Sequence, residues 1–295
     1  MFDSALRFET PATGASAALP GSDLPAHVRV DARLKLHVDF HAGATRLIER
    51  HEAGAMRFRF PRAHGRAPEA ILVNIAGGLA GGDRVTTDIA VGAGASLAIS
   101  SAAAERIYRS AGATTTLSTA LSVAAGATVI WLPQEAILHD GARVQRRFSI
   151  DLAAGASLVF GEMLYFGRRA SGEGFTHGAL RESWRVRRDG RLILADETRL
   201  TDDFSNHLLC KPALGAHVAL ATLLFAADDA GEHLTMIRAA LPEAGDVECG
   251  ASDLGGLVFI RLASPDAASL RASHIRIAAV LAGLTGKPLP RAMLT

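Results

Sequence analysis

Acidic residues inside apolar segments are the feature of this sequence that most suggests chemistry. Glu162 stands in the middle of the string LVFGEMLYF, and Asp196 directly follows the string LILA. Carboxylates in such surroundings are rarely buried unless they are paired with a cation or bound to a metal. One interpretation is a salt bridge to an arginine such as Arg106 or Arg109. The other is a polar path for a hard or borderline cation, because carboxylates and water suit weak, transient coordination.

A glycine-rich segment, IAGGLAGGD, contains Gly77, Gly78, Gly81 and Gly82 and ends at Asp83. Its spacing does not match the dinucleotide-binding loop, which needs glycines at i, i+2 and i+5. Gly77 and Gly82 have the spacing of a P-loop, but Asp83 occupies the position where a lysine must meet phosphate. We therefore predict a tight turn whose glycines allow positive φ and close backbone approach. In the functional interpretation, this turn presents Asp83 to a buried polar path.

Signatures of hydrolases and of dedicated metal sites are missing from the sequence. No Gly-x-Ser-x-Gly elbow occurs, and neither Cys210 nor Cys249 has a neighbouring histidine or aspartate that suggests an activated thiol. The 11 histidines are scattered, without a His-x-His or His-Glu-x-x-His pattern. A high-affinity metal cage is therefore not expected. Two cysteines cannot form a disulfide framework, which favours a reducing, cytoplasmic compartment.

Composition and charge exclude several classes of partner. The 295-residue chain carries 31 Lys and Arg against 30 Asp and Glu, so no long-range field attracts nucleic acid or an anionic membrane. No uninterrupted apolar stretch reaches the roughly 18 residues of a membrane span. Residues 1–25 have neither the basic start nor the apolar centre of a signal peptide. We predict a disordered segment over 1–25 and a single β-rich domain over 26–295.

The elements that must position these acids are mostly strands. Residues 30–40 alternate strictly between apolar and charged or titratable side chains, the pattern of a strand with one wet face. A strand, a glycine turn and a second strand then recur around Gly94, Gly126 and Gly155, at intervals of roughly 30 residues. A looser fourth copy turns at 189–190, an Asp-Gly pair that favours hairpins. We expect stacked β-layers, as in a solenoid or a broad sandwich; the alternative is a meander of unrelated hairpins.

Two helices are predicted in the C-terminal half. Residues 232–241 carry apolar side chains at helical spacing and are followed by Pro242. Ser264 is the predicted N-cap of a second helix, with proline at its first position and Asp266 in its first turn. That helix is expected to end at Gly286. Strands followed by late helices indicate a mostly-β fold with a small helical layer.

Several motifs together resemble those of one known family, the urease accessory protein UreD. They occur in the order of that family and cover nearly the whole chain from residue 28 onward. The motifs are GGLAGGD (77–83), ERIYRS (105–110), WLPQE with Trp131, Pro133 and Gln134, GRR (167–169) with the following Gly172, Glu173, Phe175 and Gly178, and the ending GKPLPR (286–291).

The resemblance implies a β-rich, solenoid-like fold with two helices and a protein without enzymatic activity. It also implies complexes with UreF, with the GTPase UreG and with apo-urease, through which nickel reaches the urease active site. Asp83, Glu162 and Asp196 lie where the resemblance places carboxylates along an internal, water-filled path for the metal. No cofactor is expected to bind tightly, and nickel is expected to pass transiently.

Two other functions stay open on the sequence alone. One is a plain interaction adaptor that has no path for a metal. The other is a carbohydrate-active β-helix enzyme, because such enzymes also stack β-layers. The enzyme interpretation requires paired carboxylates on neighbouring layers in an open cleft.

Overall fold

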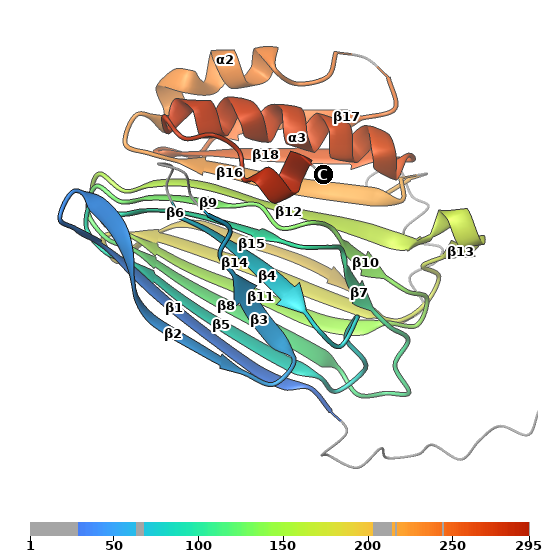
Figure 1. Ribbon diagram of the computed structural model, residues 1–295. Helices are drawn as coiled ribbons and strands as arrows, with labels where there is room; N and C mark the ends of the chain where they lie inside the picture. The colour runs from blue at the N-terminus through green and yellow to red at the C-terminus, as the bar shows by residue number, and fades with distance from the viewer. Residues whose placement is uncertain (1–28, 63–67, 203–213, 216, 244, 295) are drawn as a thin grey trace, which may run out of the picture.

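Two β-sheets stacked face to face form the body of the protein in the computed structural model, and two helices cover the outer side of the second sheet (Figure 1). The predicted mostly-β fold, with stacked layers and two helices in the C-terminal half, is confirmed. The predicted disordered segment 1–25 lies outside the described residues, and the single domain over 26–295 stays a prediction. The structure describes residues 29–62, 68–202, 214–215, 217–243 and 245–294.

The two sheets differ in size. The first has seven strands, in the order β15 (Arg191–Leu200), β14 (Ala179–Arg188), β11 (Arg143–Leu152), β8 (Thr115–Val123), β5 (Arg84–Val91), β1 (Asp31–His41) and β2 (Ala44–Ala53). The second has 11 strands. Its main path is β17 (Glu248–Asp253), β18 (Leu257–Ser264), β16 (Ala219–Ala226), β12 (Ser157–Arg168), β9 (Thr128–Trp131), β6 (Ser96–Ser101), β4 (Glu69–Asn74) and β3 (Met56–Arg59), with β7 (Glu105–Ile107), β10 (Ala136–Leu138) and β13 (Glu173–Gly174) beside it.

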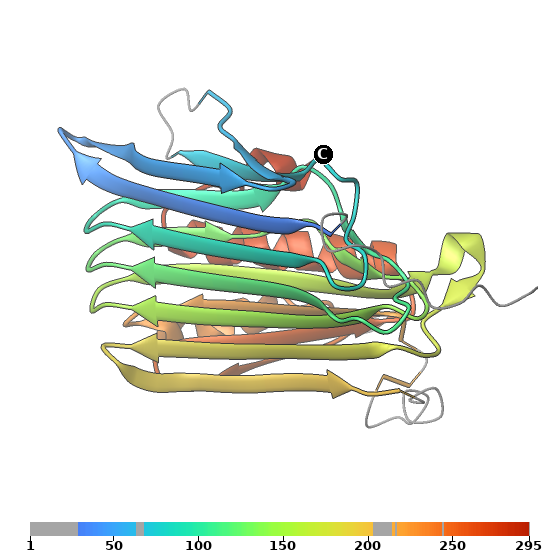
Figure 2. The same cartoon turned by 90° about the horizontal axis from the view of Figure 1, so that it is seen from below.

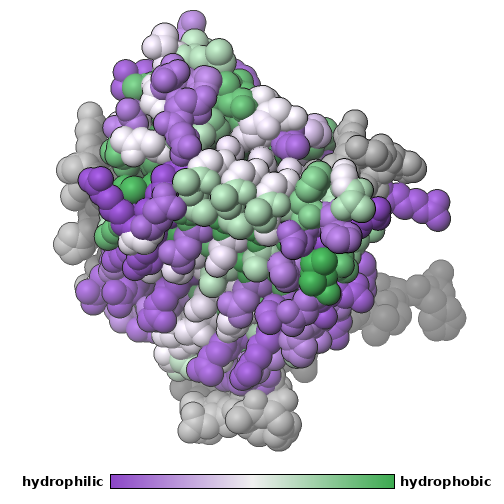
Figure 3. Space-filling view, turned by 90° about the vertical axis from the view of Figure 1, so that its left-hand side faces the viewer, coloured by the Kyte–Doolittle hydropathy of each residue, from purple (hydrophilic) through white to green (hydrophobic). Residues whose placement is uncertain are grey.

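The three glycine repeats of the sequence are coils of a solenoid. β5 continues into β6, β8 into β9 and β11 into β12, and each step crosses from the first sheet to the second. Gly94, Gly126 and Gly155 lie at these crossings with φ values of 68°, 65° and 69°, which favour glycine. Equivalent strands of successive coils pair in parallel. The exposed Ala-Gly turns gather at one end of the molecule, where they form a pale band (Figure 3).

The predicted fourth copy is a hairpin rather than a coil of the solenoid. β14 and β15 pair antiparallel within the first sheet, so the chain does not cross to the second. Asp189 and Gly190 have φ values of 48° and 78°, as a two-residue turn with two positive φ angles requires. The β1–β2 hairpin lies at the opposite edge of the same sheet. Antiparallel hairpins therefore end the stack of parallel strands on both sides.

The helices pack on the outer face of the second sheet. α3 (Ala267–Leu284) contacts β12, β16 and β18, and α2 (Leu234–Ala239) follows a 3₁₀ turn (Ala230–His233). The predicted cap of α3 was wrong: Asp266 caps the helix by accepting a hydrogen bond from Ser269 N (2.8 Å), whereas Ser264 ends β18. Within the described ranges, no helix is both long and apolar enough to cross a membrane. Two short 3₁₀ helices span Arg169–Ser171 and Arg291–Leu294.

The core between the two sheets contains a group of aromatic side chains. Trp131 and Phe160 stack with ring centroids 5.3 Å apart, and Phe148 and Trp184 pack against Phe160. All four side chains are buried. A second apolar core lies between the second sheet and the helices. Because Trp131 and Trp184 also donate hydrogen bonds to buried carboxylates, the aromatic group supports the polar side chains of the candidate site.

Candidate functional site

A cluster of three charged side chains lies between the two sheets. Arg146 on β11 forms ion pairs with Glu162 on β12 and with Glu182 on β14, and none of the three side chains is more than 6% exposed. Trp131 Nε1 donates a hydrogen bond to Glu162 Oε1 (2.7 Å), and Trp184 Nε1 donates one to Glu182 Oε1 (3.1 Å). Arg146, Glu162 and Glu182 form what we call the ion cluster. With both carboxyls ionised, it carries one net negative charge.

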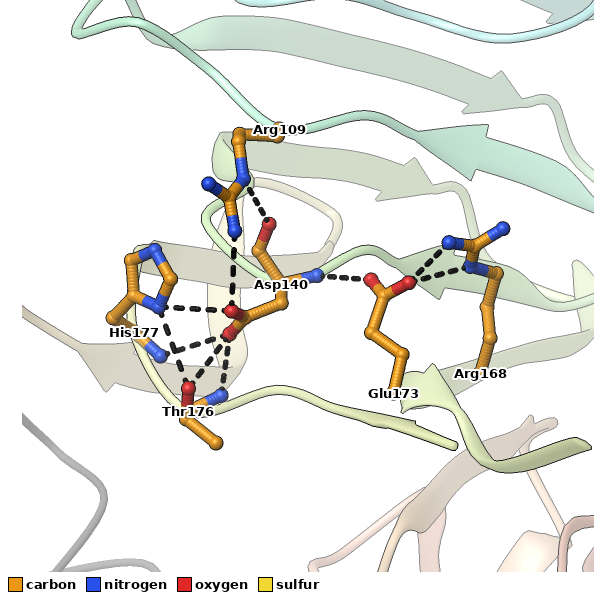
Figure 4. Close-up of polar contacts among 6 residues, drawn as sticks. All are labelled: Arg109, Asp140, Arg168, Glu173, Thr176 and His177. Carbon is orange, nitrogen blue, oxygen red and sulfur yellow. Dashed lines mark hydrogen bonds and ion pairs between the residues drawn. The ribbon is translucent and has the colours of Figure 1, made fainter. Parts of the chain in front are cut away.

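Glu162 forms a salt bridge, one of the two interpretations that the sequence left open, but its partner is neither Arg106 nor Arg109. Arg146 takes this position, while Arg109 lies 3.5 Å from Asp140 at the protein surface (Figure 4). Burial raises the pKa of the Glu162 carboxyl, and the nearby charge of Arg146 opposes that rise. The charged form of Glu162 therefore depends on Arg146.

A cavity of about 320 Å³ lies beside the ion cluster. Its wall includes the buried Glu162 and Arg146 and the half-buried Glu105. A space of this size is large enough to admit several waters. We call it the large cavity. It brings Glu105 and Glu162, which come from separate strands, to one cavity.

Glu105 is a candidate site residue that the sequence reasoning did not single out. Asn74 Nδ2 donates a hydrogen bond to Glu105 Oε1 (2.8 Å). Burial raises the pKa of the Glu105 carboxyl from 4.5 to about 7, although Asn74 and the charge of Arg146 lower it. Near neutral pH this carboxyl is therefore present in both its neutral and its charged form. The available signal was alternation, because Glu105 shares a strand face with the buried Ile107.

A smaller cavity of about 20 Å³ lies on the side of the ion cluster that faces β15 and β18. Glu162 and Glu182 line it together with Thr198 and Arg261. Arg261 forms an ion pair with Asp196, whose side chain is 23% exposed. Polar groups thus continue from the large cavity through the ion cluster to the surface at Asp196. We call this succession the polar line, and it contains two of the three predicted path residues, Glu162 and Asp196.

Asp83, the third predicted path residue, has a different environment. Its Oδ1 accepts a hydrogen bond from Val30 N (2.9 Å) and its Oδ2 accepts one from Ala80 N (2.7 Å). The residue is 3% exposed, and it does not belong to the walls of the two cavities of the polar line. The geometry gives Asp83 a role in fixing the glycine turn and the segment before β1. A role of Asp83 in a metal path stays a prediction.

The glycines before Asp83 allow another segment to approach closely. Gly78 has a φ of 155°, and a Cβ at this position would lie 2.4 Å from the ring of Tyr108. The Tyr108 hydroxyl donates a hydrogen bond to Gly77 O (2.9 Å). The predicted tight turn with close backbone approach is confirmed. The turn also borders the large cavity, because Gly77 lines it.

The WLPQE motif connects the large cavity to the C-terminal part of the chain. Trp131 holds Glu162, and Pro133 lines the large cavity. Gln134 Nε2 donates a hydrogen bond to Ala292 O (2.6 Å), and Gln134 Oε1 accepts one from Arg271 on α3. The motif therefore fixes one wall of the cavity from the side of the helices.

Asp140 holds the motif at 167–178 through contacts with its residues (Figure 4). Asp140 Oδ1 accepts hydrogen bonds from the backbone N–H groups of Thr176 (2.7 Å) and His177 (3.2 Å), and Asp140 Oδ2 lies 3.0 Å from His177 Nδ1. Glu173 accepts a hydrogen bond from Asp140 N (2.7 Å) and pairs with Arg168. Burial acts to raise the pKa of the Asp140 carboxyl, but the hydrogen bonds from Thr176 and His177 outweigh it and lower that pKa. The contacts stabilise a loop rather than form a cation site.

Along the polar line a cation would meet separate carboxylates rather than a converging set of metal ligands. Within the part of the chain that the structure describes, no group of three or more His, Cys, Asp or Glu side chains converges as metal ligands. Isolated carboxylates and water suit weak, exchangeable binding of divalent cations. The chemistry that this geometry supports is weak, exchangeable contact with a cation at separate carboxylates.

A buried histidine lies on the other side of the second sheet, on α3. His274 is fully buried, and neither of its ring nitrogens has a hydrogen-bond partner among the described residues. Gly161 makes room for it, because a Cβ at that position would lie 2.9 Å from His274 Cε1. Burial lowers the pKa of the His274 imidazole from 6.5 to about 3.

Acid is therefore expected to destabilise the protein through His274. The unfolded chain binds this proton below pH about 6.5 and the folded chain only below about 3, so stability falls as the pH drops through that range. At pH about 5 the loss from this position amounts to about 2 kcal/mol. Between neutral pH and pH about 5, the free energy of unfolding of His274→Leu should fall by about 2 kcal/mol less than that of wild type, as measured by urea denaturation. Equal losses in both proteins would contradict a buried, neutral imidazole.

Comparison with known proteins agrees with the sequence motifs. The family described as UreD urease accessory protein matches residues 30–294. A protein named urease accessory protein UreD from Methylobacterium sp. (strain 4-46) is 42% identical over 281 residues, which cover 94% of this chain and 99% of the relative. The protein of that name from Azorhizobium caulinodans is 43% identical, with 90% and 97% covered. The one from Rhodopseudomonas palustris (strain HaA2) is 44% identical, with 95% and 96% covered.

Proposed function

The chain belongs to the UreD family of urease accessory proteins, and from this premise we propose that it is a non-catalytic scaffold that passes nickel into apo-urease. In this proposal the protein acts in the cytoplasm, in a complex with UreF, the GTPase UreG and apo-urease. Nickel is the cargo of the scaffold, and no cofactor is bound tightly. The observation that carries the proposal is the polar line.

The polar line supports passage of a cation because it combines cavity space, carboxylates and access to the surface. Glu105 and Glu162 contact the same large cavity, and Asp196 lies where the polar line reaches the solvent. A carboxylate with a pKa near neutrality, such as Glu105, takes up a cation when ionised and releases it when protonated. Ni²⁺ is a borderline cation that oxygen ligands and water hold weakly, as a cargo requires.

Arg146 controls the passage in this proposal. Its guanidinium neutralises Glu162, so a divalent cation in the large cavity has to compete with Arg146 for that carboxylate. Glu182 keeps Arg146 paired while Glu162 turns to the cation, which avoids a buried charge without a partner. The ion cluster then exchanges one cation for another instead of retaining the metal.

The other two functions have less support from the site. The enzyme alternative needs two carboxylates in an open cleft, but Glu162 and Glu182 are buried and share Arg146 as a partner. The adaptor alternative accounts for the family but gives no reason for a cavity lined by carboxylates from different strands.

Complementation tests the proposed function. The chain is expressed in cells with a urease operon that lacks its own UreD, and the nickel content of the purified urease is measured by mass spectrometry together with urease activity. The chain is expected to restore both quantities and to co-purify with UreF and apo-urease. If it co-purifies with these partners but the urease stays free of nickel, the adaptor is favoured. If it neither binds partners nor restores nickel, the proposal fails.

A further inference from the structure

The outer face of the first sheet is basic at one edge. Figure 2 looks onto this face, where β11, β14 and β15 lie side by side. Strand alternation directs every second residue outward, and the outward positions of these strands are dominated by arginine. Only Asp151 and Glu197 are outward acids in the three strands. The arginines are Arg143, Arg147, Arg181, Arg185, Arg187 and Arg199, and we call these six side chains the arginine surface.

Half of the arginine surface has no partner within the described part of the protein. Arg181 and Arg185 share Glu197, and Arg143 pairs with Asp202. Arg147, Arg187 and Arg199 form no ion pair with any described residue. Arg147 and Arg199 are exposed and Arg187 is half-buried. Among the described residues these three guanidinium groups therefore have no ion-pair partner, although the outward Asp151 lies opposite Arg187 in the register of β11 and β14.

This surplus is local to one edge of the sheet. The other edge presents Arg33, Lys35 and Arg84 together with equal numbers of acids, Asp31, Asp39 and Asp88. The chain as a whole has a net charge of +1. The two edges of the first sheet therefore differ: acidic and basic side chains are equal in number at one edge, and basic side chains are in excess at the other.

An exposed apolar side chain lies within the basic edge. Leu192 is 48% exposed and pairs with Arg187 across the β14–β15 hairpin, so the two side chains are neighbours on the outer face. Arginine is enriched at protein interfaces, and Leu192 adds an exposed apolar contact beside it. Arginine also suits carboxylates because its planar fork donates two hydrogen bonds to one carboxylate.

We propose that the arginine surface binds an acidic protein surface, with Leu192 as its apolar contact. This inference rests on the proposed function, because it identifies the surface through which the scaffold holds a partner. The surface includes β15, the strand that also carries Asp196, so a partner bound there lies next to the outer end of the polar line.

A protein partner fits the arginine surface better than a nucleic acid does. The aromatic side chains of these strands, Phe148 and Trp184, are buried, so they give bases no platform for stacking. Glu197 lies among the arginines and would repel a phosphate backbone, whereas a protein surface can place a donor beside it.

The test uses the full chain and a fluorescent oligoglutamate peptide, whose binding is followed by anisotropy. Wild-type affinity is expected to fall between about 50 mM and about 300 mM NaCl, because these contacts are screened. The variant R147E/R187E/R199E should bind about tenfold or more weakly. The control R33E/K35E/R84E changes the net charge equally at the balanced edge and should stay within about twofold of wild type. If charge reversal unfolds the protein, the neutral variant R147S/R187S/R199S still tests the same three contacts.

Several outcomes would overturn the proposal. If both triple variants lose affinity equally, the peptide senses only net charge. If the arginine variants bind the peptide like wild type but lose affinity for a DNA duplex, the surface serves nucleic acid. In cells with the urease operon, the serine variant should lose a partner that wild type retains, and retention of all partners would also contradict the inference. Failure of the proposed function would instead show in the nickel content of urease with the wild-type chain.

Discussion

Replacing Arg146 with methionine is expected to lower the free energy of unfolding by about 3–5 kcal/mol. The substitution keeps an unbranched side chain but removes the cation between Glu162 and Glu182. Among the described residues, these carboxylates then keep only the indole N–H donors of Trp131 and Trp184. Whole-domain stabilities are about 5–15 kcal/mol, so a large share of the stability is at stake. Urea denaturation at neutral pH measures the loss.

Two comparisons make this expectation specific to the ion cluster. The triple variant R146M/E162Q/E182Q should recover most of the loss, because it leaves no buried charge unpaired. Arg147→Met makes the same change at the adjacent, outward-facing position and should alter stability by less than about 0.5 kcal/mol. If Arg146→Met were as stable as wild type, the ion cluster would have to be accessible to water.

The pH dependence of the Arg146→Met loss gives a further check. Burial already raises the pKa of Glu162, and removal of Arg146 takes away a charge that lowers it. A raised carboxyl pKa means that the folded protein binds protons more readily than the unfolded chain. The loss should therefore be largest at neutral pH and shrink as the pH falls toward the usual carboxyl range.

The architecture was accessible from the sequence because its repeats have a local cause. Gly94, Gly126 and Gly155 mark turns with positive φ, so their spacing reports the coils of the solenoid. The copy at 189–190 has the same kind of turn but stays within one sheet. Which sheet a strand joins depends on the neighbours that are already in place, and a local turn signal does not contain that information.

The candidate site was only partly accessible for a related reason. The apolar string around Glu162 indicated a buried carboxylate. Its partner Arg146 lies on another strand, so the local sequence around Glu162 does not identify it. Alternation in β11 was an unused signal, because Arg146 occupies the inward phase between Val144 and Phe148. Glu182 likewise lies between buried Leu180 and Trp184. A charged residue in the apolar phase of a strand indicates a buried pair, and two such residues predict each other.

Glu162→Gln is expected to lower the nickel content of urease by about tenfold or more while the accessory complex still forms. The change removes the net negative charge of the ion cluster, and a unit charge close to a divalent cation is worth several kcal/mol at protein dielectric values. Arg146 stays paired with Glu182, and the glutamine oxygen still accepts from Trp131. Nickel per urease is measured by mass spectrometry and the complex by pull-down. Glu49→Gln, at the exposed Lys35 pair, is the matched control.

Asp83→Asn distinguishes a charge that acts on nickel from one that holds the fold. Both Asp83 oxygens accept backbone N–H groups, so an amide places its own donor against one of them and costs about 1–3 kcal/mol. With that role alone, delivered nickel should fall only in proportion to folded protein. Glu162→Gln should instead reduce nickel per folded scaffold, because its position borders the cavities that a cation crosses in the proposed function. Normal nickel delivery by Glu162→Gln, at wild-type amounts of complex, would remove Glu162 from the path and leave the ion cluster a purely structural role.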